Sequence, residues 1–476
     1  MNVVDLVRAR ARSQPDAPAL LLAGGEGRPD ETVSYASLVE RFEAIEERLR
    51  AQGVVQGDRC GLVAKQGLSF VETALGILAA GGCMVPIPED TTPRALAAHC
   101  AEAHLHHLVE ARGELSLQCL PDVTPVDGKG DEVFRALRPA YLRFTSGTTR
   151  RRKGVILGHA AICARLENAN RGLAIGADDR VMWLLPMAHH FVVSILLYLS
   201  RGAGILLPTS SLARPVLELA ERARASVFYA SPFHYNLLSK DTSGVGLATV
   251  RLAVSTAEAL RPDVAAAFRA RFGRPLVQAL GIIEVGLPVI NLASAETKPQ
   301  ALGRPQPGYE VWLRGEDGRA LARSGPDHTG EICIRGTGML DAYLSPWTPA
   351  HEVLVPDGFR TGDQGFFDED GDLHLAGRRA NRINLAGMKF FCEEVEAVLD
   401  EHPGVRRSRV SARRHPHLGD IPVAEIEPAD RAAPPPRAEL VALCRERLPG
   451  YKIPREFTFV EELRTTPSGK VVRWEE

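Results

Sequence analysis

Short apolar runs alternate with segments of helical periodicity from the beginning of the chain to about residue 281. The runs end in turn residues, as in CGLVAK (60–65), CMVPIP (83–88) and GILLP (204–208). Between such runs lie stretches like LVERFEAIEERLRAQG (38–53), whose apolar residues recur at helical spacing. Strand and helix in repeated alternation are typical of βα units. The pattern therefore predicts an α/β fold for this part of the chain.

The pattern changes twice in the remaining residues. From about 301 to 378, short strands are separated by Gly, Asp and Pro, which predicts a small β-rich unit. After residue 378, helix and strand return around the Pro-rich break APPPR (433–437), which predicts a compact α+β domain over 379–476. We therefore expect one large N-terminal domain (1–378) and one small C-terminal domain.

Composition excludes several classes of protein. A chain of 476 residues with 45% hydrophobic and 24% charged residues is neither collagen, nor coiled coil, nor wholly disordered. The formal net charge of -2 gives no electrostatic reason to expect nucleic acid or an acidic membrane surface as a partner. The long apolar stretch FVVSILLYL (191–199) is shorter than the ~20 residues that span a bilayer, so it predicts a buried core helix.

The N-terminal residues and the cysteines indicate a cytoplasmic protein. MNVVDLVRARARSQPD lacks the apolar region and cleavage site of a secretion signal. The 8 cysteines contain no CxxC pair and no spacing typical of a metal site, so we expect reduced thiols, no disulfides and no zinc. The histidines of HLHH (104–107) could be interpreted as metal ligands, but surface histidines without a carboxylate or cysteine partner are commoner.

The strongest local motif is YLRFTSGTTRRRKGV (141–155), in which an apolar strand leads into a loop of hydroxyl residues around a glycine, followed by a lysine. Hydroxyls, exposed backbone N–H groups and cations can hold phosphate, and glycine lets the backbone approach it. The alternative is a solvated turn. The loop is not a Walker A motif, because Arg152 stands five residues after Gly147 and Gly154 follows Lys153.

Two further motifs lie nearer the C-terminus. In TGDQGFFDEDGDLHLAGRR (361–379), a tight turn presents Asp363, and such a carboxylate can bind both hydroxyls of a ribose. Taken alone, DEDGD within it is a hairpin turn. In TTPSGKVVR (465–473), a Ser-Gly loop presents Lys470, and taken alone this segment would be a flexible tail.

Taken together and in this order, these motifs resemble those of the superfamily of adenylate-forming enzymes, which contains acyl- and aryl-CoA ligases, nonribosomal-peptide adenylation domains and luciferases. LGIIE (280–284) is similar to the central motif of that superfamily, and GRRANRINLAGMKF (377–390) to its hinge and hairpin. The resemblance covers essentially the whole chain. It implies a large N-terminal domain of βα-sandwich subdomains with a small β-barrel-like unit, followed by a small mobile α+β domain that carries the catalytic lysine.

The resemblance also implies a reaction: a carboxylate attacks the α-phosphate of ATP to give acyl-AMP and pyrophosphate, and the acyl group then passes to a thiol. ATP and Mg²⁺ are the implied cofactors, and Lys470 is the implied catalytic cation at the carboxylate and α-phosphate. The nucleotide-binding positions that the resemblance implies are Thr145, Ser146, Gly147, Thr148, Thr149 and Lys153 for the phosphates, Ala257, Glu258 and Gly281 for the adenine side, Glu284 for Mg²⁺, and Asp363 and Arg378 for the ribose. Glu284 could instead cap a turn.

The substrate positions are implied in the same way. His189, in LPMAHHFVVSILLYLSRGAG (185–204), matches the place where the family sets a histidine or aromatic residue between the substrate and the phosphate loop, and we also count it as catalytic. Phe233 and Gly281 border the implied acyl cavity. Amino-acid-activating members supply an aspartate at the position of His189, so an aryl or fatty acid without an α-amino group is favoured. Alternatively, His189 is a hydrogen-bonded core histidine.

The thiol acceptor is expected to come from another molecule, because the chain stops soon after Lys470. CoA and a free-standing phosphopantetheinyl carrier protein both fit. Gly387 stands where the family lets pantetheine pass, although a plain hairpin turn would also explain this glycine. A homodimer and a monomer both remain open.

Some positions depart from the family pattern. Arg150 and Arg152 replace the usual Gly and Pro, Leu280 an aromatic residue, Ile283 a threonine, and Ala380 the usual hinge Asp or Lys. These departures motivate an alternative hypothesis, a catalytically silent homologue that binds nucleotide or acyl groups. A luciferase-like oxygenase is a third hypothesis, and no residue specifically supports it.

Overall fold

The computed structural model describes the 476 residues except 26–27, 121–130, 145–152, 355–357, 379–380, 386–387, 416–418, 466–470 and 473–476. The chain divides into two compact units. The first contains residues 1–310 and 335–359, and the second contains residues 311–334 and 360–476. Each unit therefore takes its residues from two separate stretches of the sequence. The predicted domain boundary at residue 378 remains a prediction.

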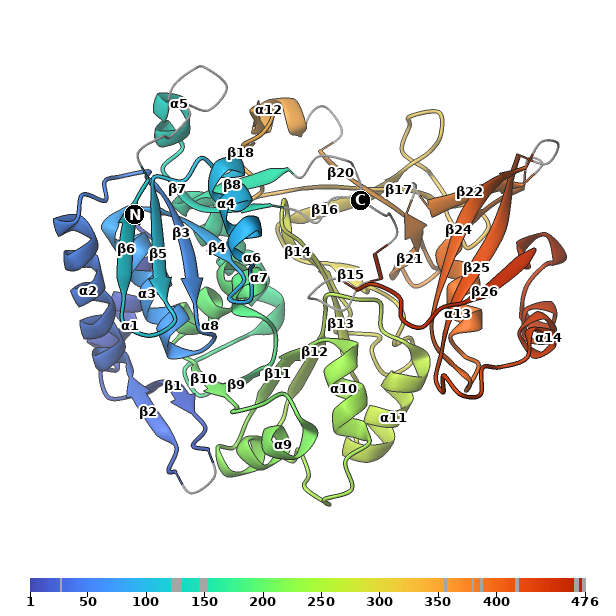
Figure 1. Ribbon diagram of the computed structural model, residues 1–476, viewed down its shortest axis with the longest axis horizontal. Coiled ribbons are helices and arrows are strands. Elements are labelled where there is room, and N and C mark those ends of the chain that lie inside the picture. Colours follow the sequence, from blue (N-terminus) through green and yellow to red (C-terminus); the bar gives the residue numbers. More distant parts are fainter. Residues whose placement is uncertain are drawn as a thin grey trace. The chain divides into compact units, whose positions relative to one another are not determined.

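The first unit contains a nine-stranded sheet, which Figure 1 shows in blue, green and yellow. Its strands, in spatial order, are β15 (Arg304–Pro305), β14 (Gly286–Ile290), β13 (Val277–Ile282), β12 (Leu252–Ser255), β11 (Val227–Ala230), β9 (Arg180–Trp183), β10 (Gly204–Leu207), β1 (Pro18–Leu22) and β2 (Glu31–Ser34). The neighbours from β13 to β1 pair in parallel. Parallel pairing requires crossovers, and helices supply them.

An eight-stranded sheet is the second layer of this unit (Figure 1). Its strands, in spatial order, are β19 (Thr348–Pro349), β18 (Ala342–Tyr343), β8 (Gly154–Gly158), β7 (Pro139–Phe144), β4 (Cys83–Ile87), β3 (Arg59–Ala64), β5 (His107–Ala111) and β6 (Ser116–Cys119). Strand β18 returns from far along the chain and pairs with β8, Tyr343 opposite Val155 and Ala342 opposite Ile156.

The largest core of the first unit joins the inner faces of both sheets. It contains Val109 and Val155 of the eight-stranded sheet, and Val181 and Ile205 of the nine-stranded sheet. The helices that contribute buried residues to it are α1 (Val4–Ser13), α2 (Tyr35–Ala51), α3 (Leu68–Ala80), α6 (His159–Leu173), the short α7 (Met187–His190) and α8 (Ile195–Arg201). Helix α3 is buried along nearly its whole length, as expected from its almost uniformly apolar sequence.

Separate cores cover the outer faces of the two sheets. On the nine-stranded sheet the outer core contains residues of α9 (Ala213–Arg222), α10 (Pro232–Ser239) and α11 (Pro262–Phe272). On the eight-stranded sheet it contains Phe134 of α5 (Asp131–Ala136), and partly buried residues of α4 (Pro93–Glu102) pack against it. The short helix α12 (Ala350–Val353) follows β19. Helices on both faces of mostly parallel sheets confirm the predicted α/β class.

The second unit contains two smaller sheets. One is a four-stranded sheet in the order β16 (Tyr309–Arg314), β17 (Gly330–Gly336), β20 (Phe359–Phe367) and β21 (Leu373–Arg378), and its outermost residues reach across the sequence boundary of the unit. The other contains β23 (Met388–Phe391), β22 (Arg382–Leu385), β25 (Gly419–Pro428), β24 (Val405–His415) and β26 (Glu456–Phe459). Helices α13 (Cys392–Leu399) and α14 (Arg437–Arg447) contribute to a core of their own with this sheet.

Candidate active site

Among the described residues of the first unit, most of the predicted nucleotide and acyl positions follow neighbouring strands of the nine-stranded sheet. Strands β9, β11, β12 and β13 are consecutive and parallel, so their carboxyl ends meet at one edge. The residues at or after these ends are His189 after β9, Phe233 after β11, Ala257 and Glu258 after β12, and Gly281 and Glu284 at the end of β13. In open α/β sheets, ligands bind outside the carboxyl ends of the strands. This edge is therefore the candidate active site.

Glu284 lies in the turn between β13 and β14, and only 9% of it is exposed. Its Oε1 accepts a hydrogen bond of 3.1 Å from the hydroxyl of Tyr343. Burial raises the pKa of the Glu284 carboxyl above its usual value, and the Tyr343 hydrogen bond and the Arg165 charge oppose that rise. An acid in this environment binds a cation readily, because a cation compensates the cost of its desolvation.

Arg165 of α6 holds the backbone at Glu284 through hydrogen bonds. Its guanidinium donates to the carbonyl oxygens of Ile283 at 2.7 Å, of Glu284 at 2.9 Å, and of Gly338. Burial lowers the pKa of Arg165 to about 10, so this side chain stays charged at neutral pH. A charged side chain of α6 therefore holds the main chain at Glu284 through its carbonyl oxygens.

Lys153 lies directly before β8 and is exposed. Its Nζ stands 4.7 Å from the centroid of the Tyr343 ring, in cation–π geometry. Phe144 and Gly154 pair with each other at the ends of β7 and β8, so these two strands bring both ends of the predicted phosphate loop together. The structure thus brings Lys153 and Glu284 to the same tyrosine: Lys153 lies over its ring, and Glu284 accepts from its hydroxyl.

The predicted ribose residues lie in the second unit. Strands β20 and β21 are antiparallel, and their register places Asp363 directly opposite Arg378. The backbone N–H of Asp363 donates to Thr361 Oγ1 at 3.0 Å, and that hydroxyl donates to the carbonyl of Ile332 at 2.9 Å. The hairpin therefore brings together two residues that the sequence analysis assigned to one ligand group.

His189 lies in α7, and its imidazole is neutral. Burial lowers the pKa of His189 to about 4, and the positive charge of Arg143 lowers it further in the same direction. Next to it in sequence, His190 contacts Trp183 edge-on, with ring centroids 6.1 Å apart, and Trp183 stacks on Tyr229 at 5.5 Å. This side of the sheet edge is therefore aromatic.

Both Gly281 and Phe233 have open surroundings. A Cβ placed on Gly281 would have Thr256 Oγ1 as its nearest neighbour at 3.8 Å, so the backbone of β13 is open at this point. Phe233, at the beginning of α10, is 52% exposed and contacts the ring of His234. The roles of both residues beside an acyl group stay predictions.

Ala257 adopts a φ of 75°, directly after β12.

Several predicted site residues lie outside the described residues: Thr145, Ser146, Gly147, Thr148, Thr149, Gly387 and Lys470, together with the side chain of Arg378. Their roles remain predictions from sequence. Where the chain is described, it holds no group of three or more His, Cys, Asp or Glu side chains that could bind a metal. Mg²⁺ in nucleotide sites usually takes one or two carboxylates together with phosphate oxygens, so the buried Glu284 carboxylate suits that ion.

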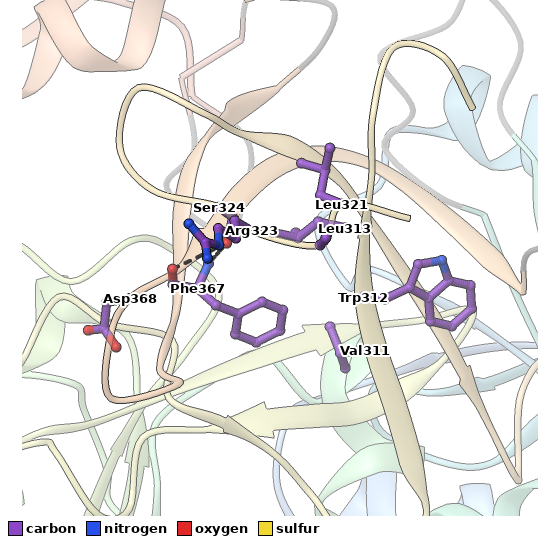
Figure 2. A pocket seen from close by; sticks show the side chains of 9 residues that line it. Val311, Trp312, Leu313, Leu321, Arg323, Ser324, Phe367 and Asp368 are labelled. Atoms are coloured by element: carbon purple, nitrogen blue, oxygen red, sulfur yellow. Dashed lines mark hydrogen bonds between the residues drawn. The ribbon is translucent and has the colours of Figure 1, made fainter. Parts of the chain in front are cut away.

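A surface pocket of about 400 Å³ lies in the second unit, between β16, the segment after it and the end of β20 (Figure 2). Its lining residues are Val311, Trp312, Leu313, Leu321, Ala322, Arg323, Ser324, Phe367 and Asp368. Ser324 Oγ accepts from the N–H of Phe367 at 2.9 Å and donates to its carbonyl at 3.2 Å. The pocket is lined by none of the predicted site residues. The two hydrogen bonds join the segment after β16 to the end of β20, which is a structural role.

Sequence reasoning missed Tyr343 and Arg165. Arg165 had a usable signal, because it is a charged residue on the face of α6 that also carries the buried Ile162 and Leu166. Tyr343 had none, because its partners Lys153 and Glu284 are distant in sequence and only the pairing of β18 with β8 brings it to them.

The fold and the site define a nucleotide-binding enzyme of the α/β class. Residues 7–344 match the family described as AMP-binding enzyme, and residues 394–470 match the AMP-binding enzyme C-terminal domain. The chain therefore belongs to the family of AMP-binding enzymes. It is an adenylate-forming ligase, which confirms the family that its motifs resemble.

Relatives and solved structures agree with this assignment. The chain is 29% identical to sulfoacetate–CoA ligase of Cupriavidus necator, over 98% of this chain and 96% of the relative. It is 27% identical to feruloyl-CoA synthase of an Amycolatopsis species, with the same shares covered. Its fold resembles ATP-bound MatB from Rhodopseudomonas palustris, with a TM-score of 0.84, 23% identity, and 99% of this chain and 97% of that chain covered.

None of the described helices is long and apolar enough to cross a membrane.

Proposed function

We propose that this ligase activates an aryl or fatty carboxylic acid without an α-amino group to acyl-AMP, and then transfers the acyl group to CoA. The observation that carries the proposal is the place of His189 after β9, with the Arg143 guanidinium donating a hydrogen bond to its backbone carbonyl. Burial and this positive charge lower the pKa of the imidazole to about 4, which favours its neutral form. An α-ammonium group requires a negative partner, and a neutral imidazole near a guanidinium offers none. An uncharged or anionic acyl group avoids that conflict.

The described residues support the adenylation step as follows. Lys153 offers a positive charge to the phosphates, and Asp363 offers a carboxylate to the ribose hydroxyls. Glu284 would hold Mg²⁺, which when bound supplies charge neutralisation to the phosphate oxygens. The neutral His189 can donate or accept a hydrogen bond at the substrate carboxylate without adding a charge. Lys470 completes the proposed set as the cation at the α-phosphate.

CoA is proposed as the acceptor because the named relatives include sulfoacetate–CoA ligase and feruloyl-CoA synthase. Both relatives are matched over almost their whole length, which makes their type of acceptor relevant to this chain. A free-standing carrier protein is the alternative acceptor. The eight cysteines are free thiols, and we propose the reducing cytosol as the location of the enzyme.

Exchange of labelled pyrophosphate into ATP tests the first half-reaction, measured with a panel of aryl, fatty and α-amino acids at saturating Mg²⁺. The expected result is exchange with at least one acid that lacks an α-amino group, and formation of its CoA thioester detected by mass spectrometry. Exchange restricted to α-amino acids would contradict the proposed substrate class. Exchange without a CoA product, but with loading of a phosphopantetheinyl carrier protein, would replace CoA as the acceptor.

A further inference from the structure

Two opposite charges of the proposed site contact the same side chain without contacting each other. The Lys153 ammonium lies over the ring of Tyr343, and the Glu284 carboxylate accepts from its hydroxyl. Lys153 and Glu284 form no ion pair with each other, and both are among the described residues. The ring of Tyr343 is therefore the partner of the Lys153 ammonium, and its hydroxyl is the partner of the Glu284 carboxylate.

Such separation is informative because a direct pair would otherwise be favourable. The positive charge of Lys153 acts on Glu284, since it contributes to lowering the pKa of that carboxyl against the larger effect of burial. A direct ion pair between them would use the charges that phosphate and Mg²⁺ need. A ligand would then have to break the pair before it could bind, which costs affinity.

The fold fixes the position of Tyr343 between Lys153 and Glu284. The residue is 6% exposed and sits in the two-residue strand β18, directly opposite Val155 of β8. The N–H of Leu344 donates to the carbonyl of Gly154 at 2.7 Å, next to Lys153.

We propose that Tyr343 is a positioning residue that holds Lys153 and Glu284 apart in the nucleotide-free enzyme, so that the ammonium stays ready for phosphate and the carboxylate stays ready for Mg²⁺. The inference rests on the proposed roles of Lys153 and Glu284, and it adds a residue that carries no net charge and performs no chemical step. The ring and the hydroxyl have different tasks, and single substitutions separate them.

Titration calorimetry of the full chain with ATP, once with EDTA and once with Mg²⁺, tests the proposal. Tyr343→Phe keeps the ring but removes the hydroxyl. It should leave the metal-free ATP affinity unchanged and reduce the gain in affinity on adding Mg²⁺ about tenfold, as removal of a group that orients a metal ligand does. Tyr343→Leu removes both, and should in addition weaken the metal-free ATP affinity about threefold.

Tyr35→Phe is the matched control. Tyr35 is fully buried, and its hydroxyl donates to the backbone carbonyls of Leu199 and Ala203, so this change also removes a buried hydroxyl but no charged partner. Both ATP affinities should stay at the wild-type values. Thermal melting of each variant shows that the binding experiments use folded protein.

The outcomes separate the two proposals. If the wild-type protein binds no ATP with or without Mg²⁺, the proposed roles of Lys153 and Glu284 fail and the inference fails with them. If the wild type binds and both Tyr343 variants match it, only the inference is overturned. Equal losses for Tyr343→Phe and Tyr343→Leu under both conditions would also overturn it, because a general structural defect does not distinguish the ring from the hydroxyl.

Discussion

At the scale of single residues, burial determines the charge state of the candidate site. Burial raises the pKa of Glu284 and lowers the pKa of His189 to about 4. The acid is consequently well placed to gain a cation, whereas the imidazole is neutral at neutral pH. One sheet edge thus combines a site for positive charge with an uncharged hydrogen-bonding group.

Lys470→Ala should abolish adenylate formation but spare the transfer of the acyl group from supplied acyl-AMP to CoA. The expected fall in pyrophosphate exchange is about a hundredfold or more, because a cation that stabilises developing charge acts mainly in that step. The two half-reactions are measured separately. Lys240→Ala, at the end of α10, removes a lysine outside the proposed site and serves as the control. Equal loss of both half-reactions would contradict the role of Lys470.

Asp363→Asn should raise the KM for ATP about tenfold with a smaller change in kcat, because hydrogen bonds from the ribose to a charged carboxylate are lost. Steady-state kinetics with varied ATP measures the change. Asp370→Asn lies in the exposed turn of the same hairpin and should leave KM unchanged. An unaltered KM in the Asp363 variant would remove this residue from the ribose site.

The site could be predicted from sequence only where its residues stand in local motifs. Lys153, Glu284 and Asp363 were predicted because each lies in a short segment with a recognisable pattern. Tyr343 and Arg165 contact Glu284 from elements more than fifty residues away in sequence. The helical pattern indicates that Arg165 lies on the buried face of α6, but a single sequence does not show which distant residue Arg165 or Tyr343 contacts.

At the scale of elements, the strands were more predictable than the helices around the site. The apolar runs at 60–65, 83–88 and 204–208 correspond to β3, β4 and β10 within one or two residues. The predicted core helix at 191–199 begins later, because a 3₁₀ turn at Phe191–Val193 precedes α8. Buried strands have uniform apolar runs bounded by turn residues, whereas a local 3₁₀ turn leaves the apolar pattern unchanged.

Gly303→Ala should destabilise the first unit by about 3 kcal/mol, measured by urea unfolding. Gly303 has a φ of +95°, and a Cβ there would lie 2.3 Å from the Cα of Asn291 in the turn after β14. Gly244→Ala is the matched control, because its φ of +79° is also left-handed but no atom lies within 4 Å of the added Cβ. Its expected cost is about 1 kcal/mol. Equal costs would show that crowding at residue 303 is relieved.

At the scale of the whole molecule, buried histidines make stability depend on pH. Burial lowers the pKa of His159, His189 and His234 to about 4 in each case. The unfolded chain, with histidine pKa values near 6.5, binds more protons between these limits. Their contribution to stability is therefore complete above pH 6.5 and is lost progressively as the pH falls toward 4.

The free energy of unfolding in urea should decrease as the pH falls from 7.5 to 5. In His159→Gln the dependence should be shallower by up to about 1.4 kcal/mol per pH unit, the value for one proton. His328→Gln removes an exposed histidine and should leave the slope as in the wild type. A slope unaffected by His159→Gln would show that this imidazole is already protonated in the folded protein.

The late return of β18 to β8 has a consequence for how the protein is made. While a ribosome builds the chain, β8 emerges long before residues 342–343 exist, so one border of a nearly finished layer stays open during much of translation. The segment that closes this border also carries Tyr343. The strand that pairs with β8 and the tyrosine that contacts Lys153 and Glu284 are therefore made at the same stage of synthesis, and a nascent chain released before residue 343 would have neither.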